Sequence, residues 1–230
     1  MKNIITFFLI IATSQVFSQS KWNIGAGASL DYCYRFNEKG NDIFFMDGST
    51  LNDYEKAGLG YTLGLKVKYD FTKHFSILSG IGFWQNNYQS RKIYLEKAVP
   101  NDPNVPDNFY WSYKKEYLQV PLLASFYLGN KIKFGVTTGF ALNFSTFQER
   151  KEYAEFNNGT LRSYTKNELD KSGNNLLFTS GIIGLGAAYN YKKMQFILEP
   201  TFNCKLFDIS PKTELYLWNA GLNLSVFYKL

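Results

Sequence analysis

The stretch LGYTLGLKVKYDF, residues 59–71, decides the fold. Its odd positions, from Leu59 to Phe71, are all apolar or aromatic, and its even positions are glycine, threonine, lysine or aspartate. This strict period of two predicts a β-strand with one apolar face and one polar or small face. Strands of soluble sheets usually have about 5–6 residues, whereas about 9–11 tilted residues cross a bilayer. The stretch therefore predicts a strand that is long enough to span a membrane.

The same alternation recurs along the rest of the chain. The expected strands are 22–32, 59–71, 75–88, 116–128, 132–147, 176–191, 194–206 and 218–230. Long polar segments and short turns alternate between them until a connection of medium length precedes the last strand. An even number of antiparallel strands with this alternation is typical of bacterial outer-membrane barrels. We therefore expect an all-β protein, an eight-stranded antiparallel transmembrane up-and-down β-barrel with short periplasmic turns and long extracellular loops.

The alternative is a soluble, lipocalin-like barrel, whose apolar face would point inward. The polar faces of these strands are rich in glycine, serine and threonine with scattered charges, as in Gly25, Gly27 and Ser29 of the first strand. Small and polar side chains suit the narrow lumen of an eight-stranded barrel that exposes its apolar face to lipid. Aromatic residues near the strand ends, such as Tyr69 and Tyr228, suit an interfacial girdle. We therefore favour the membrane barrel.

The N-terminus has the pattern of a secretory signal peptide. Lys2 precedes a short apolar run at residues 4–12, and Val16 and Ser18 occupy the −3 and −1 positions of a cleavage site. The run is too short for a spanning helix, although a membrane anchor or a buried helix is the alternative. We expect residues 1–18 to be removed and residues 19–230 to form the barrel domain of an exported protein in the outer membrane of a gram-negative bacterium.

The fourth expected strand carries a family resemblance. EYLQVPLLASFYLG, residues 116–129, resembles the Y-L-x-[IV]-P-L-L segment of the PorT-like outer-membrane β-barrel family of Bacteroides-type bacteria. The glutamine after the signal peptide and the aromatic last strand, NLSVFYKL, are similar to that family too. The resemblance implies an outer-membrane barrel and, for some members, a role beside a secretion machinery. It implies no catalytic residues.

Charged residues at inward positions form the candidate site, which we expect inside the lumen. They are Asp31, Lys66, Lys68, Asp70, Lys133, Glu199, Lys205 and Lys229. One interpretation is a permeation path. The other is a structural network of neutralising charges that plugs a lumen only wide enough for side chains. We favour the structural network.

Residues with chemical reactivity are few. His74, the single histidine, falls in a short turn that we place on the periplasmic side, away from outer-leaflet lipid, so we predict no catalysis. Cys33 and Cys204 lie on strands that are not neighbours, and we expect free thiols, with Cys204 facing lipid. The spacing of ligand-type residues predicts no metal site and no cofactor.

The long segments are the remaining functional candidates. Residues 108–117, NFYWSYKKEY, mix aromatics with lysine, which predicts either a binding surface or an extension of a strand above the membrane. The net charge is +6, but no compact Lys/Arg block predicts nucleic-acid binding. We expect a monomer in contact with outer-membrane lipid, with protein partners at loops or turns. A structural or surface-interaction role comes first, an accessory role in a secretion complex second, and a lipid-modifying enzyme last.

Overall fold

A computed structural model describes residues 21–37, 51–95, 102–167, 177–209 and 215–230. The expected signal peptide, residues 1–18, lies outside the described residues. No helix in the described part of the chain is both long enough and apolar enough to cross a membrane.

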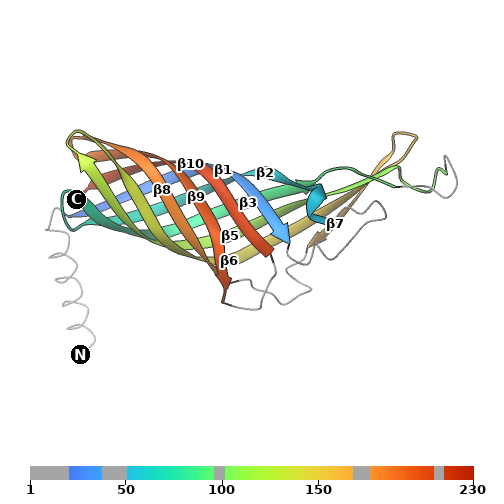
Figure 1. Ribbon diagram of the computed structural model, residues 1–230, viewed down its shortest axis with the longest axis horizontal. Helices are drawn as coiled ribbons and strands as arrows, with labels where there is room; N and C mark the ends of the chain where they lie inside the picture. Colours follow the sequence, from blue (N-terminus) through green and yellow to red (C-terminus); the bar gives the residue numbers. More distant parts are fainter. Residues whose placement is uncertain (1–20, 38–50, 96–101, 168–176, 210–214) are drawn as a thin grey trace, which may run out of the picture.

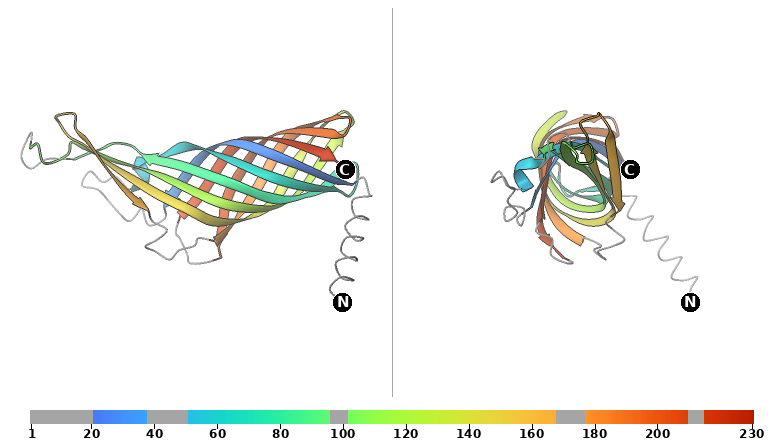
Figure 2. Two further views of the ribbon diagram at one scale, coloured as in Figure 1. Left: turned by 180° about the vertical axis from the view of Figure 1, so that it is seen from behind. Right: turned by 90° about the vertical axis from the view of Figure 1, so that its right-hand side faces the viewer.

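Eight antiparallel strands close into a ring (Figures 1 and 2), which confirms the predicted barrel. They are β1 (Trp22–Asn37), β2 (Glu55–Asp70), β3 (Phe75–Ser90), β5 (Asn108–Gly129), β6 (Ile132–Glu155), β8 (Leu177–Tyr191), β9 (Met194–Asp208) and β10 (Leu215–Lys229). Each strand pairs with its neighbours in the chain, and β1 pairs with β10 from Asn23 opposite Lys229 to Asn37 opposite Leu215. Closure satisfies the backbone groups of the ring without an open edge, as hydrocarbon requires.

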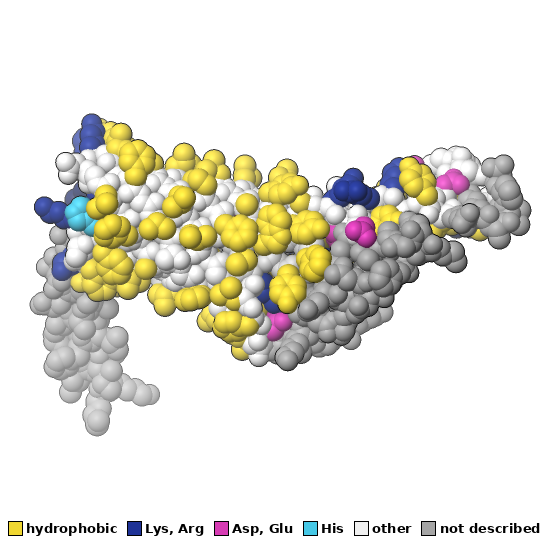
Figure 3. Space-filling view, viewed as in Figure 1, with side chains coloured by type: hydrophobic (Ala, Val, Ile, Leu, Met, Phe, Trp, Pro, Cys, Tyr) yellow, Lys and Arg dark blue, Asp and Glu magenta, His cyan; other side chains and the backbone are white. Residues whose placement is uncertain are grey.

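The strand alternation directs apolar side chains outward over the whole barrel. Leu59 in β2 is 74% exposed and Leu30 in the adjacent strand β1 is 76% exposed, whereas Asn23 and Asp31 are buried in the lumen. Hydrophobic side chains accordingly cover the barrel wall in Figure 3, and Lys and Arg side chains gather at the turn end on its left. This distribution is that of a protein with lipid outside and a polar interior.

Aromatic side chains gather on the outer surface at the turn end. The rings of Tyr69 and Phe71 lie 4.8 Å apart, and those of Phe71 and Phe75 lie 5.7 Å apart. On another side of the barrel but also at the turn end, Lys192 Nζ lies 5.4 Å from the centre of the Tyr191 ring. Aromatic rings beside lysines at one depth suit the membrane–water interface, as the sequence predicted.

Several segments that we predicted to be loops are strands instead. β5 begins at Asn108 rather than at residue 116, and β6 continues to Glu155. Two strands outside the ring, β4 (Ile93–Tyr94) and β7 (Leu161–Asn167), pair with these extensions, and the 3-10 helix η2 (Leu51–Tyr54) precedes β2. Alternating aromatic and charged residues pair across the extended strands, and such cross-strand pairs stabilise a sheet outside the membrane. Residues 108–117 are thus a strand extension, one of the two predicted alternatives.

Candidate functional site

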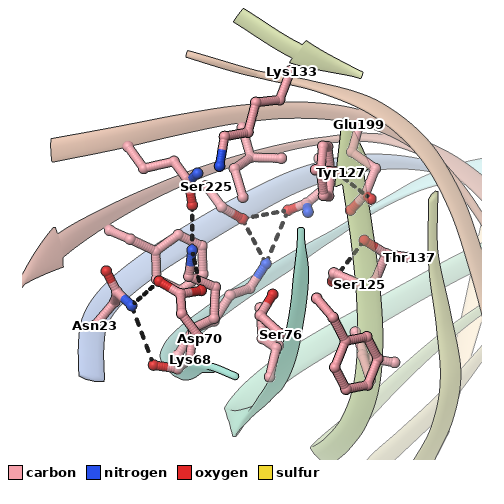
Figure 4. Close-up of a pocket in the computed structure, with 18 of the residues that line it drawn as sticks. Asn23, Lys68, Asp70, Ser76, Ser125, Tyr127, Lys133, Thr137, Glu199 and Ser225 are labelled. Atoms are coloured by element: carbon pink, nitrogen blue, oxygen red, sulfur yellow. Dashed lines mark hydrogen bonds and ion pairs between the residues drawn. The ribbon is translucent and has the colours of Figure 1, made fainter. Parts of the chain in front are cut away.

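The lumen of the barrel contains a cavity of about 840 Å³ at the turn end. We call it the turn-end cavity (Figure 4). Seven of the eight predicted lumen charges line it: Asp31, Lys66, Lys68, Asp70, Lys133, Glu199 and Lys229. The inward alternation of the strands therefore places these side chains around one space.

Two lysines of β2 occupy the cavity wall with different partners. Lys66 Nζ donates hydrogen bonds to Ser225 Oγ at 2.7 Å and to Asn223 Oδ1 at 3.3 Å. Lys68 Nζ lies 3.2 Å from Asp70 Oδ1 and also donates to Gln195. Lys68 therefore has a paired countercharge, whereas the hydrogen bonds of Lys66 go to neutral groups.

The carboxylates of the cavity accept hydrogen bonds mainly from neutral groups. Asp31 accepts from Ser29 Oγ at 2.5 Å and from Thr62 Oγ1 at 2.7 Å. Glu199 accepts from Tyr127 Oη at 3.0 Å, an interaction drawn in Figure 4. These two carboxylates are satisfied by hydroxyl groups, so the cavity is not a simple set of ion pairs.

Glycines in the strands make room for these charged side chains, which lie close to the backbone. A Cβ atom on Gly184 would lie 2.7 Å from Glu199 Cδ, and one on Gly27 would lie 2.6 Å from Lys66 Nζ. Carbon and nitrogen atoms that are not bonded do not approach so closely without displacement. Glycine at these inward positions therefore leaves the space that the long charged side chains fill.

The eighth predicted residue, Lys205, lies apart from the turn-end cavity. Its Nζ is 2.7 Å from Asp208 Oδ1 and 5.8 Å from the centre of the Phe178 ring. Phe178 belongs to a cluster of buried side chains, which we call the aromatic plug. The plug begins in the other half of the lumen and includes residues of β4 and of the β5 extension. The plug consists of Trp84, Tyr88, Ile93, Trp111, Tyr113, Tyr117, Phe178 and Leu217.

Sequence reasoning did not identify the aromatic plug. Trp84 lies 5.1 Å from Tyr117 and 6.3 Å from Phe178, measured between ring centres. The plug follows the cavity directly along the strands, because Gln119 lines the cavity and Tyr117, the next inward residue of β5, belongs to the plug. The signal was present in the sequence, as large aromatics at inward positions near the long-loop ends of the strands.

A buried ion pair lies beside the plug. The Arg35 guanidinium contacts the Glu55 carboxylate and lies 4.0 Å from the centre of the Tyr113 ring and 4.8 Å from that of Tyr88. The Trp111 indole N–H donates to Glu55 at 3.4 Å. The charge of Arg35 is thus balanced by a carboxylate and two aromatic faces inside the barrel.

The extensions of β5 and β6, with β4 and β7, form what we call the extracellular hairpin (Figure 1). Its rings of Tyr110 and Tyr153 stack 4.8 Å apart. At its far end, Lys92 Nζ donates to Glu155 Oε2 at 2.5 Å, and Asn108 donates to the same oxygen at 3.2 Å. The hydrogen bond from Lys92 and that from Asn108 lower the pKa of Glu155 below its ordinary value. The hairpin therefore has an internal network of charges and rings.

The residues considered for chemistry lie apart from one another. His74 is exposed in the β2–β3 turn, and its Nδ1 lies 3.0 Å from the Tyr127 carbonyl oxygen. Both cysteines are free: Cys33 is buried in the lumen, and Cys204 is half-buried and lines an apolar groove on the outer wall. In the described ranges, no three His, Cys, Asp or Glu side chains form a group suited to a metal ion.

A comparison with protein families identifies the family of this chain. The profile of the family described as "Outer membrane protein beta-barrel domain" matches residues 13–210. The chain belongs to this family. Family membership agrees with the ring of eight strands and with the apolar outer wall, and it locates the protein in the outer membrane. A comparison with curated proteins found no match.

Several solved structures are similar to this chain. Ail, the attachment invasion locus protein of Yersinia pestis, is 12% identical with a TM-score of 0.40, over 90% of this chain and 99% of that one. Neisserial surface protein A is 9% identical with a TM-score of 0.43, over 90% and 97%. The outer membrane protease OmpT of Escherichia coli is 10% identical with a TM-score of 0.39, over 91% and 97%.

Proposed function

We propose that this protein is a non-catalytic outer-membrane barrel that contacts partners at the cell surface through its extracellular hairpin. The observation that carries the proposal is the continuation of β5 and β6 beyond the ring. β6 pairs with β8 only as far as Phe144, and from Glu149 onward it pairs with β7. A paired, projecting sheet holds its side chains in fixed positions, which lowers the entropy cost of binding.

The surface of the hairpin has the composition of a recognition surface. Tyr94 is 82% exposed and Tyr164 is 57% exposed, and Tyr164 lies opposite Glu152 in the sheet. Salt bridges join Lys151 to Glu149 at 3.1 Å and Arg150 to Glu152 at 2.9 Å. Exposed tyrosines on an ordered scaffold supply contact area at low conformational cost.

The surroundings of His74 support a role without catalysis. The ring nitrogen of His74 bonds to a backbone carbonyl, and the described hydrogen bonds of this ring include none to a serine, a cysteine or a carboxylate. Nucleophilic catalysis by histidine requires such a partner within hydrogen-bond reach.

A site-specific photocrosslinking experiment in living cells tests the proposal. The crosslinker replaces Tyr164 on the hairpin, Lys192 in the β8–β9 turn, or Leu185 on the lipid-facing wall, where 65% of the side chain is exposed. We expect protein or glycan adducts at residue 164 and only lipid adducts at residue 185. Protein adducts at residue 192 with none at residue 164 would reject the surface role.

Protein adducts at residue 192 alone would favour the accessory role in a secretion complex, which the PorT-like segment at residues 117–123 suggests. The observation that favours this alternative is the set of lysines at the turn end, where Lys73, Lys192 and Lys193 from two turns line the cavity. Such a rim offers charged contacts to a periplasmic protein.

A further inference from the structure

The turn-end cavity is a blind pocket that faces the periplasm. Its mouth lies between the three short turns, represented by Thr72, Asn130 and Lys192, and its inner end meets the aromatic plug at Gln119 and Asn219. Its volume of about 840 Å³ falls in the range of about 300–1,000 Å³ that is usual for small-molecule sites. A small molecule therefore fits inside the cavity and enters it from the periplasmic side only.

The lining of this cavity has a large excess of positive charge. Eight lysines and three carboxylates line it, a formal surplus of five positive charges. The lysines are Lys21, Lys66, Lys68, Lys73, Lys133, Lys192, Lys193 and Lys229. A narrow cavity with low-dielectric walls focuses such a field and attracts anions.

Few of these lysines are hydrogen-bonded to a carboxylate of the cavity. Hydroxyl groups satisfy Asp31 and Glu199, and Asp70 alone of the three forms an ion pair with a cavity lysine in the described ranges. Lys66 Nζ instead donates to a serine and an asparagine. Lys133 Nζ donates to the backbone oxygen of Lys73 at 2.9 Å. Charged donors with only neutral partners are groups that an anionic ligand binds strongly.

The inner end of the cavity offers acceptors. Asn203 in β9 and Asn219 in β10 lie opposite each other in the sheet and are 8% and 4% exposed. Their Oδ1 atoms have no hydrogen-bond partner among the described residues. Buried acceptors without partners are costly, and a ligand with hydroxyl groups would satisfy them.

We propose that the turn-end cavity binds a small periplasmic solute that carries two or more negative charges together with hydroxyl groups, such as a phosphorylated or carboxylated polyol. The lysines bind its anionic groups near the mouth and the wall, and Asn203 and Asn219 accept from its hydroxyl groups at the inner end. This site is separate from the extracellular hairpin, and its mouth opens toward the opposite side of the membrane.

Calorimetric titration of the folded full-length barrel in nanodiscs of zwitterionic lipid tests the site. The probes are glucose 6-phosphate, citrate and neutral glucose. The first carries a phosphate and several hydroxyls, the second carries carboxylates, and the third lacks charge. We expect both anions to bind, less tightly as salt is added, and glucose not to bind. The stronger of the two anions identifies phosphate or carboxylate as the preferred group.

Two double variants with the same change of charge make the test specific. Lys133→Gln/Lys229→Gln alters the cavity, and Lys114→Gln/Lys151→Gln alters the extracellular hairpin, where the lysine side chains are 42% and 44% exposed. We expect affinity for the anions to fall by about tenfold or more in the first and to stay within about twofold in the second. Equal losses in the two variants, equal binding of glucose, or no binding of either anion at millimolar concentration would overturn the proposal.

Discussion

The two halves of the lumen differ although the same strands build both. Toward the turns many inward side chains are small or charged, as Ser125 and Lys68 are, and they leave a cavity beside a smaller buried cluster that includes Tyr127 and Phe227. Toward the long loops the inward side chains of the same strands are Tyr117 in β5 and Trp84 in β3, and they close the lumen. An eight-stranded barrel is only just wide enough to be filled by side chains. The volume of each inward residue therefore decides whether a given level of the barrel is filled or hollow.

The largest loss of stability should follow removal of the aromatic plug. Trp84→Ala combined with Tyr117→Ala deletes two rings that lie 5.1 Å apart and are almost fully buried. Each large-to-small change of this kind costs about 3–5 kcal/mol of unfolding free energy, and the two costs are not additive because the rings touch. Urea unfolding of protein refolded into vesicles measures the loss. In planar bilayers the wild-type barrel should carry no stable current, and the double variant should pass ions.

Tyr117→Phe is the matched control, because it keeps the ring. The Tyr117 hydroxyl is buried and has no hydrogen-bond partner among the described residues, so its removal should leave stability unchanged or raise it by about 1 kcal/mol. A stable current through the wild-type protein would contradict the closed plug.

The next effect concerns the ion pair beside the plug. Arg35→Met leaves the Glu55 carboxylate buried without its countercharge, and we expect a loss of about 3–5 kcal/mol in unfolding free energy. Lys114→Met, which breaks the exposed Lys114–Glu116 pair, is the control and should cost less than about 1 kcal/mol. Similar losses in the two variants would show that the Arg35 pair is not isolated from solvent.

The contrast between the halves also shows what the sequence could predict. Period-two alternation predicted the eight strands of the ring and the inward direction of seven charges that line the cavity, because strand geometry alone decides which way a side chain points. It did not predict that Trp84 and Phe178 meet, since that contact joins β3 to β8 across the lumen and depends on strand stagger. The strand extension to Glu155 was missed because its residues are polar on both faces, as expected for a sheet in water rather than in lipid.

A smaller loss of unfolding free energy should follow the replacement of a glycine that lies beside a charged side chain of the cavity. In Gly184→Ala the new methyl group would meet Glu199 Cδ at 2.7 Å, so Glu199 must shift, which disturbs its hydrogen bond from the Tyr127 hydroxyl. We expect a loss of about 1–3 kcal/mol in urea unfolding, as is usual for overpacking. Gly82→Ala is the control, because its nearest neighbour would be the Leu63 carbonyl oxygen at 3.4 Å. A larger loss at Gly82 than at Gly184 would contradict this account of the glycines.

The smallest effect concerns the far end of the extracellular hairpin, where charges are paired with each other rather than left for a ligand. The hydrogen bond from Lys92 lowers the pKa of Glu155. The pair therefore stabilises the hairpin end fully at pH values above the ordinary glutamate pKa of about 4.3. This stabilisation is lost as the pH falls through the lowered pKa. In Lys92→Met the midpoint of the Glu155 carboxyl titration, followed by NMR, should rise. An unchanged midpoint would contradict the pairing. Since 35% of the Glu155 side chain is exposed, added salt should also reduce the difference between the two proteins.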